Sequence, residues 1–125
     1  MVERTGGVVV VVDDDADLRD LVVEFLVQSG FAAVGAAHGR EALARARAGR
    51  ARPALFVLDL EMPVMSGWEF RREQVRDPVL ARIPVLVTSS ADPGPMCFDG
   101  YLAKPYAPGE LLRAVSAMGV AAKAA

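Results

Sequence analysis

Residues 8–14 of the chain are VVVVVDD, a run of five valines followed by two aspartates. Two later stretches share this arrangement, an apolar run that ends in a charged residue: LFVLD at residues 55–59 and YLAK at residues 101–104. Short apolar or β-branched runs of this kind are typical of buried parallel strands. We therefore expect three strands that end at Asp13 and Asp14, at Asp59 and at Lys104.

Strand-like and helix-like segments alternate along the whole chain, which predicts an α/β, doubly wound fold with a parallel sheet. The expected strands cover residues 8–12, 32–36, 54–58, 85–88 and 100–103. The expected helices cover residues 16–29, 40–48, 67–75 and 108–118. Apolar residues recur at helical spacing in the first of these helices, and Gly30 follows it as a C-cap.

The stretch between the last two expected strands, residues 90–99, is short and contains Pro93, Gly94 and Pro95. Proline and glycine oppose a continuous helix. We expect a loop or a single turn here, in place of the helix that otherwise joins two parallel strands.

The bulk properties fit one soluble domain. The chain has 125 residues, 53% of them hydrophobic, and a net charge of -2, which gives no general attraction to nucleic acid. One cysteine excludes an internal disulfide, and no apolar run approaches the roughly 18 residues of a membrane span. Residues 1–7 do not resemble a signal peptide, so a cytoplasmic location is expected. Five arginines between Arg40 and Arg52 are interpreted as the solvated face of a helix.

The carboxyl ends of parallel strands meet at one edge of a sheet, where ligands bind in open α/β folds. The three aspartates Asp13, Asp14 and Asp59 and the ammonium group of Lys104 should therefore share one crevice. Carboxylate oxygens suit a hard divalent cation, and a carboxylate can also attack phosphorus as a nucleophile. The pattern predicts a site for a divalent cation and a phosphoryl group.

Four motifs occur in order at compatible spacings: the acidic pair, the stretch DLEMPVMSG at residues 59–67, a hydroxyl residue at the end of the fourth strand, and Lys104-Pro105. With these motifs the chain resembles the CheY-like receiver domain of bacterial two-component response regulators, from about Val8 to Val115. The resemblance implies a five-stranded sheet in the order 2-1-3-4-5 and a Lys-Pro bond that is commonly cis. It also implies a single receiver domain over residues 1–125, with a core of about 8–118 and no output domain.

The resemblance further assigns roles to the site residues. Asp59 would be the phosphoacceptor, with Mg²⁺ as the cofactor. Asp14, Asp59 and the backbone carbonyl of Glu61 would bind the metal directly, and Asp13 would act through a metal-bound water. Lys104 would contact the phosphoryl oxygens.

The switch residues also come from the resemblance. Counted from Pro84, the receiver pattern places the switch hydroxyl at Ser89, with Thr88 as the alternative one position earlier. Tyr101 matches the aromatic switch position on the last strand. Its alternative interpretation is a half-buried strand tyrosine without a switching role.

The function implied is a phosphorelay receiver that takes a phosphoryl group from a sensor histidine kinase or a phosphotransfer protein. It would then change its contacts with an unknown downstream protein, with only self-phosphorylation and self-dephosphorylation as chemistry. No direct contact with nucleic acid and no membrane insertion are expected. The alternatives are a binding module of the same fold that does not use phosphorylation, a small haloacid-dehalogenase-type phosphatase, and a flavin binder.

Overall fold

The computed structural model describes residues 7–48, 53–62, 64–91 and 98–122. Its centre is a five-stranded parallel sheet in the order β2-β1-β3-β4-β5, as predicted. The strands are β1 (Val8–Val12), β2 (Ala32–Ala36), β3 (Pro53–Asp59), β4 (Val85–Ser89) and β5 (Gly100–Ala103). β1 and β3 lie inside the sheet and are almost entirely buried, as expected for parallel strands covered on both faces.

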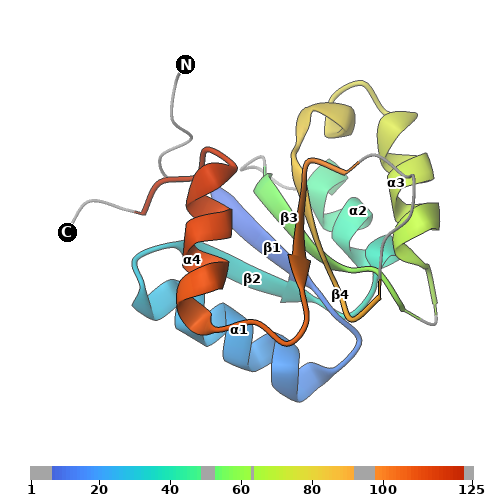
Figure 1. The fold of residues 1–125 in the computed structure, drawn as a ribbon. Coiled ribbons are helices and arrows are strands. Elements are labelled where there is room, and N and C mark those ends of the chain that lie inside the picture. Colours follow the sequence, from blue (N-terminus) through green and yellow to red (C-terminus); the bar gives the residue numbers. More distant parts are fainter. Residues whose placement is uncertain (1–6, 49–52, 63, 92–97, 123–125) are drawn as a thin grey trace.

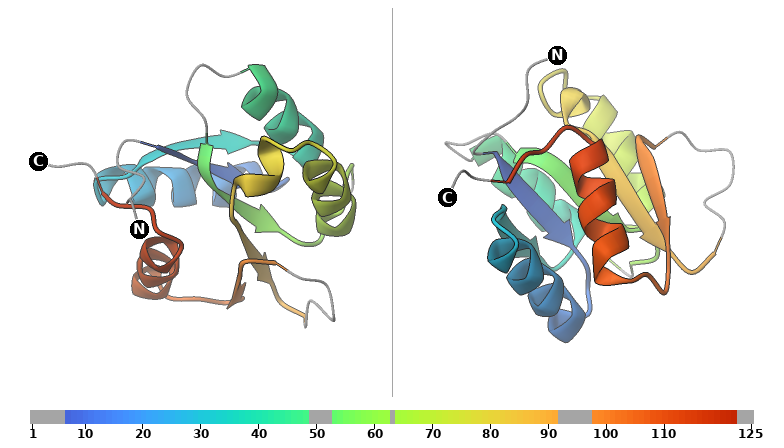
Figure 2. Two further views of the ribbon diagram at one scale, coloured as in Figure 1. Left: turned by 90° about the horizontal axis from the view of Figure 1, so that it is seen from above. Right: turned by 60° about the vertical axis from the view of Figure 1, so that its left-hand side comes forward.

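Two pairs of helices cover the two faces of the sheet (Figures 1 and 2). α1 (Ala16–Gln28) and α4 (Pro108–Ala117) lie on one face, and α2 (Gly39–Ala48) and α3 (Gly67–Val75) lie on the other. A short 3₁₀ helix, η1 (Leu80–Arg82), precedes β4. The molecule is thus a three-layer α/β fold, in agreement with the predicted class.

Successive residues of the strands supply two separate apolar cores, because side chains alternate between the faces of a sheet. Val9, Val11 and Val57 pack with α1 and α4. Val10, Val12 and residues of the neighbouring strands pack with α2, α3 and η1. The two cores hold β1 and β3 rigidly, and both strands end at the acidic residues.

The prediction for residues 90–99 agrees with the part of this stretch that the structure describes. Ser90, Ala91, Phe98 and Asp99 are not helical. Residues 92–97, including the two prolines, Gly94 and Cys97, lie outside the described residues. The fourth helix in chain order, α4, is only ten residues long and follows β5.

The start of α3 is pressed against the chain that follows Asp59. The Gly67 N–H donates to the Leu60 carbonyl at 2.9 Å. A Cβ at Gly67 would lie 2.6 Å from Leu60 Cδ1 and 3.0 Å from Leu60 Cα. Only glycine permits this close approach. Ser66 and Glu69 complete the helix start with a reciprocal capping box. The contact fixes the loop that leaves the site.

A buried glutamine connects α3 to the segment before β4. Gln74 is fully buried, and its Nε2 donates to the carbonyls of Leu80 at 2.9 Å and Ile83 at 2.8 Å. Its Oε1 accepts from Arg71 Nη1 at 2.9 Å. These bonds supply a donor to two carbonyls near the start of β4, of which that of Leu80 also accepts from the Ile83 N–H at 3.0 Å. They also fix where β4 begins. None of the helices within the described residues has the length and apolar character needed to cross a bilayer.

We predict that Gln74→Met lowers the free energy of unfolding by about 1 to 3 kcal/mol, because the Leu80 and Ile83 carbonyls each lose one buried donor while the side-chain volume hardly changes. Urea unfolding followed by circular dichroism measures the loss. Arg72→Ala, at an exposed position of the same helix, is the control and should change the value by less than about 0.5 kcal/mol. Equal stabilities of the two variants would contradict the role given to Gln74.

Candidate functional site

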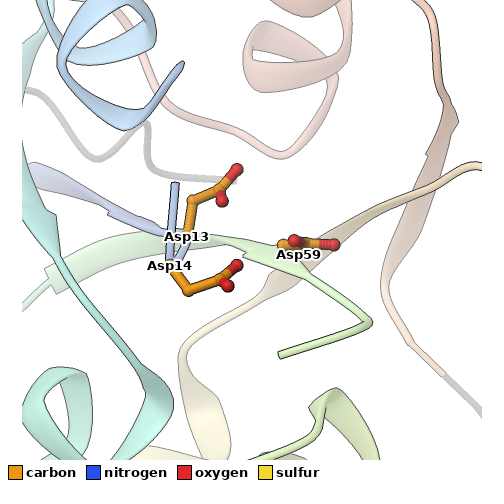
Figure 3. Close-up of side chains that lie close together, drawn as sticks. All are labelled: Asp13, Asp14 and Asp59. Carbon is orange, nitrogen blue, oxygen red and sulfur yellow. The ribbon is translucent and has the colours of Figure 1, made fainter. Parts of the chain in front are cut away.

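The carboxylates of Asp13, Asp14 and Asp59 meet at the carboxyl ends of β1 and β3. One ligand oxygen from each residue lies within 4.8 Å of the others. Figure 3 shows Asp13 and Asp14 leaving the end of β1 on the side where Asp59 lies at the end of β3. Asp13 is buried, Asp14 is exposed and Asp59 is intermediate. The sequence prediction that these three side chains share one crevice is confirmed.

Asp13 is held through several of its polar groups. Its N–H donates to the Ala36 carbonyl of β2 at 3.2 Å. Its Oδ1 accepts from the Asp15 N–H at 2.9 Å. Asp15 in turn caps α1, since its Oδ1 accepts from the Leu18 N–H at 3.2 Å. Asp15 is therefore the N-cap of α1, and the loop before α1 presents Asp13 in a fixed orientation.

Lys104 brings the positive charge to the cluster. Its Nζ lies 3.6 Å from Asp59 Oδ1 and 3.9 Å from Asp13 Oδ2. Its backbone N–H donates to the Ser89 carbonyl at 2.8 Å, which ties the end of β5 to the end of β4. The Lys104-Pro105 bond is cis, as the resemblance implied. One ammonium group faces three carboxylates, so the site keeps an excess of negative charge.

The environment of Asp59 disfavours its ionised form. Burial is the largest cause and raises the pKa of Asp59 above its ordinary value of 3.8. Lys104 and the Glu61 N–H, which donates to Asp59 Oδ1 at 3.2 Å, act in the opposite direction. Asp13 and Asp14 add to the increase through repulsion. Asp59 is therefore a carboxylate whose charge is only partly compensated by the protein.

A divalent cation fits this donor set. Magnesium prefers oxygen ligands and is usually held by one or two carboxylates while it keeps several waters. The cluster offers hard oxygens at suitable mutual distances, one of them on an exposed residue that leaves room for water. A cation would also relieve the repulsion that raises the pKa of Asp59. The Glu61 backbone lies beside Asp59 through the N–H bond.

The two hydroxyl residues at the end of β4 are both buried. Thr88 pairs with Asp59 in the sheet register, and its side chain lies on the opposite face of the strand from that of Ser89. Ser89 Oγ lies 3.4 Å from Glu61 Oε1 and accepts from the Ala91 N–H at 3.0 Å. Ser89 thus faces the loop that follows Asp59.

Tyr101 is more exposed than a half-buried strand residue, with 44% of its surface accessible. Its hydroxyl lies 3.3 Å from the Ser89 carbonyl and 3.2 Å from the Ala91 carbonyl, so its single proton is shared between them. Tyr101 is therefore tied to the backbone on both sides of Ser90.

Two residues near the site were not singled out in the sequence. Burial, Asp13 and Asp59 raise the pKa of the Tyr106 phenol, in that order of importance. Arg19 Nη1 donates to the Asp13 carbonyl at 2.8 Å. Tyr106 directly follows Lys104-Pro105, which is a signal of proximity. The contact of Arg19 depends on how α1 lies over the sheet, and no motif marks it.

An apolar groove of about 440 Å³ opens beside the cluster, between α1 and α4. Lys104 and Ser90 line the end next to the carboxylates, and apolar side chains of both helices line the rest. Leu21, at the rim, has 63% of its surface exposed. A polar site and an exposed apolar surface are thus continuous.

Comparisons with known proteins agree with this geometry. The family model of the response regulator receiver domain matches residues 9–116. The chain is 35% identical to the alkaline phosphatase synthesis transcriptional regulatory protein SphR of Synechococcus elongatus, over 83% of this chain and 45% of SphR. It is 27% identical to the phosphate regulon transcriptional regulatory protein PhoB of Pseudomonas aeruginosa, over 90% of this chain and 52% of PhoB.

Among solved structures, the chemotaxis response regulator CheY4 of Vibrio cholerae superimposes with a TM-score of 0.81 at 30% identity. The alignment covers 90% of this chain and 98% of CheY4. The chain spans about half the length of SphR and PhoB. Because the family model matches most of the residues, and the sheet order is the one that the family resemblance implied, the chain belongs to the response regulator receiver domain family.

Proposed function

We propose that this chain accepts a phosphoryl group on Asp59 from a histidine kinase or a phosphotransfer protein, and that phosphorylation changes its contacts with a downstream protein. The observation that carries the proposal is the group of three carboxylates within 4.8 Å of one another, with Lys104 Nζ 3.6 Å from Asp59. Such a group is costly to hold together and suits a phosphoryl group and its cation.

Asp59 acts as the nucleophile. One of its carboxylate oxygens forms a bond to phosphorus, the bond from phosphorus to the donor's imidazole nitrogen breaks, and that nitrogen keeps the electron pair. The Glu61 N–H and Lys104 hold Asp59 in place before the transfer. Because little covalent chemistry is asked of the protein, positioning and charge stabilisation supply most of the rate.

The remaining residues bind the cation and the transferred group. Asp14, Asp59 and the Glu61 carbonyl would hold Mg²⁺ directly, and Asp13 would act through a metal-bound water. Bound Mg²⁺ supplies neutralisation of the charge that gathers on the phosphoryl oxygens. Lys104 contacts one of these oxygens as a point charge, and the Ser89 hydroxyl turns from Glu61 towards another.

Movement of Ser89 reaches the surface through Tyr101. The Tyr101 hydroxyl is shared between the carbonyls of Ser89 and Ala91, so a shift at the end of β4 changes this contact. A new charge cluster that biases one two-state element is a common form of switch. In this account the exposed position of Tyr101 belongs to the unphosphorylated state.

The protein is a signalling domain, with only self-phosphorylation and self-dephosphorylation as its own chemistry. We propose that residues 1–125 form one receiver domain with a core of about 8–118, and that its output is a protein contact rather than direct binding of nucleic acid. A cytoplasmic location follows from the proposed donor, since a kinase draws its phosphoryl group from ATP.

The groove between α1 and α4 is the proposed docking surface for the phosphoryl donor. The donor must place its phosphoryl group within bonding distance of Asp59, and the groove opens directly beside Lys104. A few residues that fill desolvated pockets contribute most of the binding free energy of an interface, and burying an exposed leucine side chain is favourable by about 1.5 to 3 kcal/mol. Leu21, exposed at the rim, is suited to this contact.

A binding module that has lost phosphorylation is not favoured. Such a module would have no physical reason to keep three mutually repelling carboxylates together with Lys104.

The test of the proposal is the intact mass after incubation with acetyl phosphate and Mg²⁺. We predict that the wild type gains one phosphoryl group and that Asp59→Asn gains none, because the amide is not a nucleophile towards phosphorus. Asp17→Asn, in the first turn of α1, should gain the group as the wild type does. A wild type that gains no mass from acetyl phosphate or from a cognate kinase would contradict the proposal.

We predict that Asp59→Asn unfolds at a higher temperature than the wild type at pH 7 in EDTA. The pKa of Asp59 in the folded protein lies above the value of 3.8 that it has in the unfolded chain. Between these two pKa values the folded state binds more protons than the unfolded state, so the stability of the wild type falls as the pH rises from one to the other. A difference of about 1 kcal/mol in the free energy of unfolding would shift the Tm by roughly 3 to 5 °C. Calorimetry between pH 3 and 8 measures the difference.

The difference in Tm should close below pH 3.8, where the carboxyl group is neutral in both states. Saturating Mg²⁺ should reverse the order, because it stabilises the wild type more. Asp20→Asn, on the exposed side of α1, should behave as the wild type. A lower Tm of Asp59→Asn in EDTA would show that the carboxylate does not strain the site.

We predict that Leu21→Ala slows phosphotransfer from a cognate histidine kinase by about 10-fold, which corresponds to a contact of about 1.4 kcal/mol, and leaves the acetyl phosphate reaction within about 2-fold. Phosphotransfer rates by radiolabel measure both. Val27→Ala removes an apolar residue of the same helix that is also exposed but lies outside the groove. Equal losses in the two variants would exclude the groove as the docking surface.

A further inference from the structure

Arg19 joins the first turns of α1 to the backbone of the acidic pair. Its Nη1 donates to the Asp13 carbonyl at 2.8 Å, six residues back along the chain. Within the described residues no ion pair connects Arg19 to a carboxylate of the cluster. The guanidinium therefore acts on the main chain and leaves the carboxylate oxygens available to a cation.

The hydrogen bond from Arg19 to the Asp13 carbonyl also orients the backbone of Asp14. The carbonyl of Asp13 and the N–H of Asp14 belong to one planar peptide unit. The Asp13 N–H is already bonded to the Ala36 carbonyl, and its side chain is bonded to the Asp15 N–H. The bond from Arg19 fixes the remaining polar group, so the chain enters Asp14 in one orientation. Asp14 is the exposed carboxylate of the three.

Gly35 on β2 allows Arg19 to reach this carbonyl. The Arg19 side chain crosses the strand so closely that a Cβ at position 35 would lie 2.9 Å from Cδ, 3.1 Å from Cγ and 3.2 Å from Nε. Any larger residue would displace the arginine. β2 is next to β1 in the sheet, so the absence of a side chain at Gly35 leaves room for the Arg19 side chain to extend from α1 to the end of β1.

We propose that Arg19 is a positioning residue for the cation site: it holds the Asp13–Asp14 peptide, and Gly35 is the residue that lets it do so. The inference rests on the proposed function, in which Asp14 binds Mg²⁺ directly. Removing a group that orients a metal ligand without binding the metal itself typically weakens metal affinity or activity by 10-fold to 100-fold. Arg19 does so through a carbonyl, without touching the metal, the phosphoryl group or Asp59.

The experiment is isothermal titration calorimetry with Mg²⁺ on the full chain. Arg19→Met keeps the apolar stem over Gly35 but removes the donor, and should weaken Mg²⁺ binding by about 10-fold. Arg19→Lys keeps a cationic donor and should recover most of that loss. Arg113→Met, the same substitution at an exposed position of α4, should bind Mg²⁺ as the wild type does.

A double-mutant cycle separates positioning from a general loss of stability. Gly35→Ala should weaken Mg²⁺ binding by about as much as Arg19→Met, and the two changes together should cost no more than either alone, because both remove the same contact. Full additivity of the two losses would overturn the inference. Gly35→Ala alone serves as the test if Arg19→Met fails to fold.

A readout without metal completes the test. The amide resonance of Asp14 in ¹⁵N spectra recorded in EDTA should shift in Arg19→Met and in Gly35→Ala, and stay in place in Arg113→Met. If the wild type binds Mg²⁺ and gains a phosphoryl group while both variants keep wild-type affinity, the inference alone fails. If the wild type does neither, the proposed function fails and the inference with it.

Discussion

The mutual repulsion of Asp13, Asp14 and Asp59 is the constraint around which this molecule is arranged. Three carboxylates each place a ligand oxygen within 4.8 Å of the others, and Lys104 brings a positive charge close to two of them, Asp13 and Asp59. Burial, the largest cause, raises the pKa of Asp59, and the repulsion from Asp13 and Asp14 raises it further. A folded chain can hold such a group only if its backbone is stiff. The same uncompensated charge makes the site receptive to a cation and, through it, to a phosphoryl group.

Stiffness comes from two of the inner strands of the sheet, β1 and β3. β1 and β3 are buried on both faces by the helix pairs, and they end side by side at the acidic residues (Figures 1 and 3). Contacts at the edge of the sheet refine the positions: Arg19 holds the Asp13 carbonyl, and Gly67 holds the chain after Asp59 against α3. In contrast, Tyr101 lies at the surface on the edge strand β5, where a movement of β4 can be transmitted to a partner.

The fold and the cluster could be predicted from the sequence because both follow from local pattern. Apolar runs identify the strands, and the rule that parallel strands end at one edge brings Asp13, Asp59 and Lys104 together. The contacts of Arg19 with Asp13 and of Gln74 with the start of β4 could not be predicted. They depend on how far a helix lies from the sheet, and a side chain that crosses a neighbouring strand leaves no periodic signal.

The most direct measurement of the central claim is a crystal structure with Mg²⁺ and beryllofluoride, which mimics a phosphoryl group on a carboxylate. We expect beryllofluoride on Asp59, within hydrogen-bond distance of Lys104 Nζ and Ser89 Oγ, at about 2.7 to 3.2 Å. We also expect Mg²⁺ at about 2.1 Å from oxygens of Asp14, Asp59 and the Glu61 carbonyl. Beryllofluoride bound elsewhere, or a cation held without Asp14 and Asp59, would contradict that claim.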